Sequence, residues 1–101
     1  MPITCTGDRE RLIFSVTGEV DHHGAKGLME QMDVKLESIP ARRVVLDLSG
    51  VTFMDSSGIA VLLRAHRRAG ETGSTVTVRG TPDQAMKVLR AAGLTRLMKF
   101  E

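Results

Sequence analysis

The apolar run Val44–Leu48, near the middle of the chain, most constrains how this sequence folds. Four of its five residues are Val or Leu, which is typical of a central strand covered on both faces. Other β-prone runs precede and follow it, and segments with helical apolar spacing separate most of them. Strand-helix-strand steps of this kind make parallel, right-handed crossovers. We therefore expect an α/β fold: a mixed β-sheet of four to five strands with about three helices packed against it.

Turn residues and apolar patterns give approximate bounds for these elements. The first two strands, joined by Gly7-Asp8-Arg9, are expected to form an antiparallel hairpin, and Gly18 to end the second. The expected strands are Ile3–Thr6, Leu12–Val16, Val44–Leu48 followed by Val51–Met54, Thr75–Val78 and Leu97–Phe100. The expected helices are about Gly24–Ser38, about Gly58–Ala69 and a third that begins after Thr81.

Capping residues mark the helix ends. Asp21 or His22 is placed to cap the first helix. Thr81 and Gln84 have the spacing of a capping box on the third, and Gly93 is expected to end it. The apolar stripe of the first helix is Leu28, Met32, Leu36 and Ile39. The apolar stripe of the third is Ala85, Val88, Leu89 and Ala92.

Length and composition exclude several classes of protein. The chain has 101 residues, of which 42% are hydrophobic, too many for a disordered segment. We expect a single domain over residues 1–101, with no membrane-spanning segment and no secretory signal. The lone Cys5 excludes an intrachain disulfide and a Cys-based metal site. These features favour a small cytoplasmic protein, with little chain to spare for an enzyme's substrate cleft.

The net charge of +2 combines two unlike portions. Residues 1–40 carry four Lys or Arg against seven Asp or Glu, a net charge of −3, whereas residues 41–101 carry ten against five, a net charge of +5. Nucleic-acid binding through Arg64, Arg67 and Arg68 is one hypothesis. Aromatic side chains for base stacking are scarce, because the chain has three Phe and neither Tyr nor Trp. We therefore expect no direct nucleic-acid partner.

The segment Asp55-Ser56-Ser57-Gly58 lies between an expected strand and an expected helix. Functional residues of α/β sheets are commonly found at such a junction. The free N–H groups and the positive end of the helix dipole stabilise an anion there, including a phosphate carried by a serine. The alternative is that Asp55 or a serine only caps the helix. The segment therefore predicts either a helix cap or a modifiable serine.

A second polar loop, Gly18–His23, precedes the first helix. It holds the carboxylates of Glu19 and Asp21 beside two imidazoles. A solvated loop with a helix cap is the simpler interpretation. Both polar loops follow strands into helices, however, so parallel crossovers place them at the same end of the sheet. Together they would form one acidic patch beside a hydroxyl group.

Known catalytic and metal-binding patterns do not fit these segments. A nucleophile elbow needs glycine where Met54 and Asp55 stand, and no segment supplies a Walker phosphate-binding loop. His22 and His23 are adjacent, so a helix would not direct both to one metal ion. A lone His66 on an apolar helix face is expected to be a structural residue. The sequence thus predicts no catalytic site, metal ion or cofactor.

The two polar segments in their apolar contexts resemble a known family. Leu12–His23, with its Gly18-Glu19-Val20-Asp21 core, is similar to the opening of STAS-domain anti-sigma factor antagonists, most closely the sporulation type. Val44–Ile59, an apolar strand that runs into Phe53-Met54-Asp55-Ser56-Ser57-Gly58, resembles the signature of that family. The resemblance implies a STAS fold over nearly the whole chain.

The resemblance also implies a regulator that works by partner switching. Such proteins bind an anti-sigma factor, itself a GHKL-type serine kinase with bound ATP or ADP, and so release the sigma factor. By position, Ser56 is the residue that the kinase phosphorylates to abolish binding, and a PPM-type phosphatase reverses the step. Asp55 is expected to orient the Ser56 hydroxyl. The residues expected at the partner surface are Glu19, Asp21, His22, Asp55, Ser57 and Gly58.

One alternative remains for the same fold. A STAS module could sense a small molecule or nucleotide at the helix start formed by Asp55–Gly58. The segment is not a glycine-rich phosphate cradle. The sequence therefore favours the interaction module over the ligand sensor.

Overall fold

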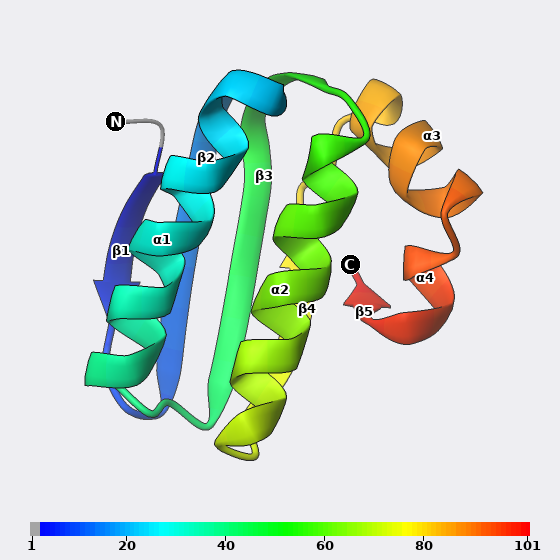
Figure 1. The fold of residues 1–101 in the computed structure, drawn as a ribbon. Coiled ribbons are helices and arrows are strands. Elements are labelled where there is room, and N and C mark those ends of the chain that lie inside the picture. The colour runs from blue at the N-terminus through cyan, green and yellow to red at the C-terminus, as the bar shows by residue number, and fades with distance from the viewer. Residues whose placement is uncertain (1–2) are drawn as a thin grey trace.

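A computed structural model describes residues 3–101 and arranges them as a five-stranded sheet with helices (Figure 1). In chain order the elements are β1 (Ile3–Gly7), β2 (Arg11–Val20), α1 (His22–Ser38), β3 (Arg43–Met54), α2 (Ser57–Glu71), β4 (Thr75–Arg79), α3 (Asp83–Ala91), α4 (Leu94–Leu97) and β5 (Lys99–Phe100). The expected α/β class is confirmed, with one more helix than expected.

The strands lie in the order β1-β2-β3-β4-β5. β1 pairs antiparallel with β2, while β2–β3, β3–β4 and β4–β5 are parallel. This is the expected mixed sheet, because each helix returns the chain to the same end of the sheet. The run Val44–Leu48 lies in β3, in the middle of the sheet, and its Val and Leu residues are buried.

The helices α1 and α2 lie side by side over one face of the sheet, whereas α3 contacts β3 and α4, and α4 contacts β5 (Figure 1). Alternate strand residues reach this helix-covered face and form the core with Leu28, Met32 and Leu62. Asp33 of α1 accepts hydrogen bonds from Nε (3.0 Å) and Nη2 (2.6 Å) of Arg64 on α2. Leu28, Met32 and Leu36 of the apolar stripe predicted for α1 are buried, whereas the fourth member, Ile39, follows the helix as its half-buried C-cap residue.

The prediction that Gly18 ends β2 is wrong. The strand continues to Val20, and its register against β3 shifts at Ser15–Thr17 and again at Gly18–Glu19. Gly18 has a φ of +81°, which a residue without Cβ adopts at little cost. The glycine therefore marks a β-bulge rather than a strand end. Beyond the bulge, β2 continues through Glu19 to Val20.

The capping box predicted at the start of α3 is wrong. Pro82 occupies the N-cap position, and the Thr81 hydroxyl is buried without a hydrogen-bond partner in the described chain. The Gln84 amide instead bonds the backbone of Met54, accepting from its N–H and donating to its C=O, each at 2.8 Å. β4 pairs with β3 only as far as Asp47. At Met54, on the side of β3 away from β2, the Gln84 amide therefore takes the place of a neighbouring strand.

Replacing Gln84 with alanine is expected to lower the free energy of unfolding by about 1–2 kcal/mol, because two backbone groups of Met54 would lose their partners. Urea denaturation measures the change. Lys87→Ala, at an exposed position of the same helix, is the control and should change the free energy by less than about 0.5 kcal/mol. Equal values for the two variants would contradict this role of Gln84.

The C-terminal segment also differs from expectation. Leu94–Leu97 form the short helix α4, and only Lys99–Phe100 continue as a strand. Gly93 ends α3 in the left-handed conformation, with a φ of +81°, as predicted. Ala92 is exposed rather than buried, since the chain turns at Gly93 before that position reaches the core. No helix in residues 3–101 is long and apolar enough to cross a membrane.

Candidate functional site

The two polar loops meet at one end of the sheet. Val20, at the end of β2, lies beside Met54, at the end of β3, in parallel register. Just past them the Asp55 N–H donates to the Val20 C=O at 3.1 Å. The starts of α1 and α2 are therefore adjacent, as the parallel crossover predicts.

Asp55 joins the starts of both helices. Its Oδ1 accepts from the Ser57 N–H at 2.7 Å, and its Oδ2 accepts from the His22 N–H at 3.2 Å. These bonds, above all the one from Ser57, hold the pKa of Asp55 below its ordinary value. The carboxylate is thus engaged with backbone N–H groups rather than with the Ser56 hydroxyl, which the sequence analysis expected it to orient.

Asp21 caps α1, as predicted. Its Oδ1 accepts from the N–H groups of His23 and Gly24, each at 3.1 Å. The side chains of His22 and His23 are exposed, with ring centroids 6.0 Å apart. Asp21 therefore fixes the loop on the α1 side as Asp55 does on the α2 side.

Ser56 is the N-cap residue of α2, although its side chain does not act as a cap. It is exposed and already has helical dihedral angles, φ −62° and ψ −16°. Its side chain makes no capping hydrogen bond within residues 3–101. Ser57, in contrast, is half-buried and donates its N–H to Asp55. The more accessible hydroxyl of the pair thus belongs to Ser56.

Gly58 packs against the core directly below the loop. A Cβ at this position would lie 2.4 Å from Cγ and Sδ of Met54. The Met54 side chain is itself buried among the sheet and the helices, with 1% exposure. Gly58 therefore allows the first turn of α2 to lie directly on the end of β3.

Glu19 and Phe53 border the loops on neighbouring strands. They are paired in the β2–β3 register, and both are exposed. Phe53 is 44% exposed, which the sequence analysis missed because the residue lies in an apolar strand. Val51 and Met54 are buried while Thr52 and Phe53 between them are exposed, so simple alternation fails here. An exposed aromatic beside a polar loop is a typical anchor at protein interfaces.

The arginine cluster proposed for nucleic acid is largely neutralised. Arg64 pairs with Asp33, and Arg68 pairs with Asp33, Glu37 and Glu71. Only Arg67 of the three has no such pair among the ion pairs of the described residues. The arginines therefore link α1 to α2 and do not present three free cations on one face.

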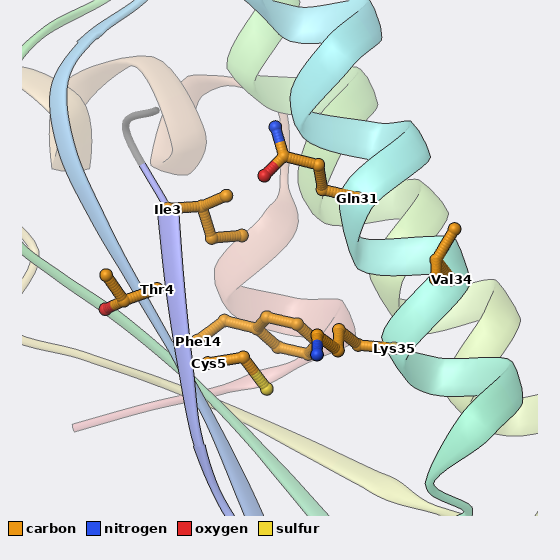
Figure 2. Close-up of a pocket in the computed structure, with 7 residues that line it drawn as sticks. All are labelled: Ile3, Thr4, Cys5, Phe14, Gln31, Val34 and Lys35. Carbon is orange, nitrogen blue, oxygen red and sulfur yellow. The ribbon is translucent and has the colours of Figure 1, made fainter.

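An apolar groove lies between β1 and α1, away from the two loops (Figure 2). This β1–α1 groove has a volume of about 220 Å³ and is lined chiefly by Ile3, Cys5, Phe14, Gln31, Val34 and Lys35. Its mainly apolar lining does not suit a nucleotide phosphate. No group of three metal-ligating side chains gathers anywhere in residues 3–101. The groove therefore adds no support for nucleotide sensing at Asp55–Gly58.

The bonds of Asp55 predict how stability varies at low pH. A carboxyl whose folded pKa is lowered contributes stability above its unfolded pKa, about 3.9, and loses it as the pH falls through the folded value. We expect Asp55→Asn to lower the melting temperature at pH 7, and the difference from the unsubstituted protein to shrink below about pH 4. Thermal unfolding between pH 2.5 and 7 measures this, and a difference that stays constant would contradict it.

Comparisons with known proteins agree on the family. The family described as Mlab, STAS domain matches residues 3–99. An anti-sigma F factor antagonist of Paenibacillus polymyxa is 31% identical over 87 residues, which cover 86% of this chain and 74% of the relative. An anti-sigma-B factor antagonist of Listeria monocytogenes is 26% identical over 96 residues, covering 93% and 82%.

Solved structures show the same fold. The anti-sigma factor antagonist SpoIIAA in its unphosphorylated form has a TM-score of 0.84 and 20% identity, covering 98% of this chain and 87% of that one. The phosphorylated form of the Bacillus cell fate determinant SpoIIAA has a TM-score of 0.74, also at 20% identity, covering 98% and 90%. The sequence matches and the fold agree, and the chain belongs to the STAS-domain family of anti-sigma factor antagonists.

Proposed function

We propose that this protein is an anti-sigma factor antagonist that acts by partner switching in the cytoplasm. In its unphosphorylated form it binds an anti-sigma factor, a GHKL-type serine kinase with bound ATP or ADP, and the sigma factor is released. The kinase phosphorylates Ser56 and binding is lost, until a PPM-type phosphatase restores the hydroxyl. The names of the similar antagonists support this role, and family members typically act as regulators rather than as enzymes.

The exposure of Ser56 is the observation that carries the proposal. The hydroxyl lies at the start of a 15-residue helix, outside the capping bonds that hold Asp55 and Ser57. A kinase can reach it without unfolding the loop. The N–H groups of Ser57, Gly58 and Ile59 already have acceptors, so the positive end of the α2 dipole is what would stabilise the resulting phosphate. Phosphorylation should therefore leave the fold intact.

The proposed partner surface surrounds Ser56 on both loops. Glu19 and His22 are exposed, and Asp21 and Asp55 hold their helix starts in place. We assign the surface to Glu19, Asp21, His22, Asp55 and Ser57, with Phe53 at its border and with the buried Gly58 positioning the start of α2 beneath it.

The charge of the phosphate provides the switch. A phosphoserine adds about −1.5 to −2 charges at neutral pH, next to Asp55 and near the carboxylates of the second loop. A partner that packs closely over neutral Ser56 would have to desolvate that charge or face it with charges of its own. Such a mismatch is large enough to dissociate a complex without a large conformational change.

Phosphorylation by the cognate anti-sigma factor with ATP tests the proposal. We expect one phosphate per chain, mapped to Ser56 by mass spectrometry, and none on Ser56→Ala. Ser57→Ala is the matched control and should still be phosphorylated at Ser56. Phosphate on Ser57 or elsewhere in the unsubstituted protein would refute the assignment of Ser56.

A further inference from the structure

The outer edge of β1 presents unpaired backbone groups. β1 is the first strand in the sheet order and has β2 as its one neighbour in residues 3–101. The Asp8 N–H donates to the Arg11 C=O at 3.0 Å, which closes the hairpin. Because hydrogen-bonded pairs alternate along an antiparallel ladder, Thr4 and Thr6 direct their backbone groups toward β2. The N–H and C=O groups of Cys5 therefore point outward.

The β1–α1 groove lies beside this edge. Ile3 and Cys5 of β1, Phe14 of β2 and Val34 of α1 line it, as Figure 2 shows. Val34 is 60% exposed and lies between the polar residues Gln31 and Lys35 in the α1 part of the lining. Burial raises the pKa of the Cys5 thiol, so the thiol is neutral at pH 7 and adds to the apolar lining. The groove is thus a mainly apolar pocket next to the outer edge of β1, which has no strand partner within residues 3–101.

A single charged side chain lines the groove within residues 3–101. Lys35 is the one charged residue in its lining, and its ammonium group is near enough to Cys5 to oppose the effect of burial on the thiol pKa. The strand Ile3–Gly7 contains no charged residue, although sheet edges are normally protected by charges, bulges or covering elements. The edge therefore lacks the usual charges against strand addition and carries one cation beside it.

We propose that this edge binds an extended, acidic segment of a partner protein by strand addition. The segment pairs its backbone with Cys5, places an apolar side chain against Val34 in the groove and sets a carboxylate near Lys35. Backbone bonds supply affinity in this mode, and the pocket and the charge supply selectivity. A second copy of this chain fits less well, because antiparallel pairing about Cys5 would bring two Lys35 side chains together.

Amide hydrogen exchange and two synthetic heptapeptides test the proposal. The probes are acetylated, amidated peptides of sequence TVTETVT and TVTKTVT, in which the Val residues and the charged residue face the same side of an extended strand. We expect the acidic peptide to slow exchange of the outward Cys5 N–H and to slow alkylation of its thiol, and to bind several-fold more tightly than the basic one. Val34→Asp should weaken binding of the acidic peptide at least tenfold, because the apolar contact is lost and the new carboxylate repels the glutamate of the peptide.

Charge reversal gives the control. Lys35→Glu should invert the preference between the two peptides, whereas Lys26→Glu, exposed on the same helix but outside the groove, should leave it unchanged. Exchange at Cys5 that neither peptide slows would overturn the proposal. So would exchange that slows with protein concentration alone, because a second copy would then occupy the edge. Ser56→Asp should bind the acidic peptide normally, so this test is independent of the proposed switch.

Discussion

Ser56→Asp is expected to weaken binding to the cognate anti-sigma factor by roughly 30- to 4,000-fold. The carboxylate places a permanent charge at the start of α2, where the unsubstituted protein presents an exposed neutral hydroxyl. Loss of a well-matched contact at a charged interface costs roughly 2–5 kcal/mol of binding free energy, which corresponds to that range of affinity. Isothermal titration calorimetry measures the change.

Two variants at the same loop control this result. Ser56→Ala removes the hydroxyl without adding charge, so its affinity should stay within a few-fold of the unsubstituted protein. Ser57→Asp places the same charge one residue later, on a half-buried residue whose N–H already bonds Asp55, and its melting temperature must be measured alongside. Unchanged affinity of a folded Ser56→Asp variant would contradict the switch.

Gly58→Val is expected to destabilise the fold by about 3 kcal/mol and to lower the melting temperature by about 12–24 °C. A Cβ at this position would lie within 2.4 Å of the Met54 side chain, which is buried with 1% exposure. The added atoms therefore have to displace Met54 or lift the first turn of α2 from the sheet. Differential scanning calorimetry measures the shift.

Gly70→Val is the matched control for this prediction. Gly70 lies on the same helix, and a Cβ there would meet nothing within 4 Å, so its replacement should change the melting temperature by only a few degrees. Met54→Ala should cost less stability in the Gly58→Val background than in the unsubstituted protein, because valine at position 58 occupies part of the space that the smaller side chain leaves. Equal effects of valine at both glycines would show that contact with Met54 is not the cause.

The strands and the meeting of the two loops could be predicted because they depend on local apolar patterns and on the handedness of crossovers. The start of α3 could not. The spacing of Thr81 and Gln84 matches a capping box, but β4 pairs with β3 only to Asp47, so Met54 has β2 on one side and no strand on the other. Gln84 fills that gap. The capping box therefore does not form, because Gln84 bonds the backbone of Met54 instead. No local sequence pattern indicates this tertiary contact.

Only part of the candidate site could be predicted, because some of its hydrogen bonds are local and others join distant segments of the chain. Asp21 caps α1 as its position suggests, since capping is local. The bond between Asp55 and the His22 N–H spans 33 residues, so no local pattern indicates that this carboxylate joins both loops. The exposure of Phe53 depends on the irregular register beyond Gly18. The open edge of β1 depends likewise on the order of the strands.

Titrating the purified anti-sigma factor with this protein, before and after phosphorylation of Ser56, tests the central claim most directly. The account predicts tight binding of the unphosphorylated form, with release of the sigma factor, and a loss of affinity of at least about 30-fold on phosphorylation. Circular dichroism should show the same fold in both forms. Equal affinity of the two forms, with Ser56 fully phosphorylated, would contradict the account.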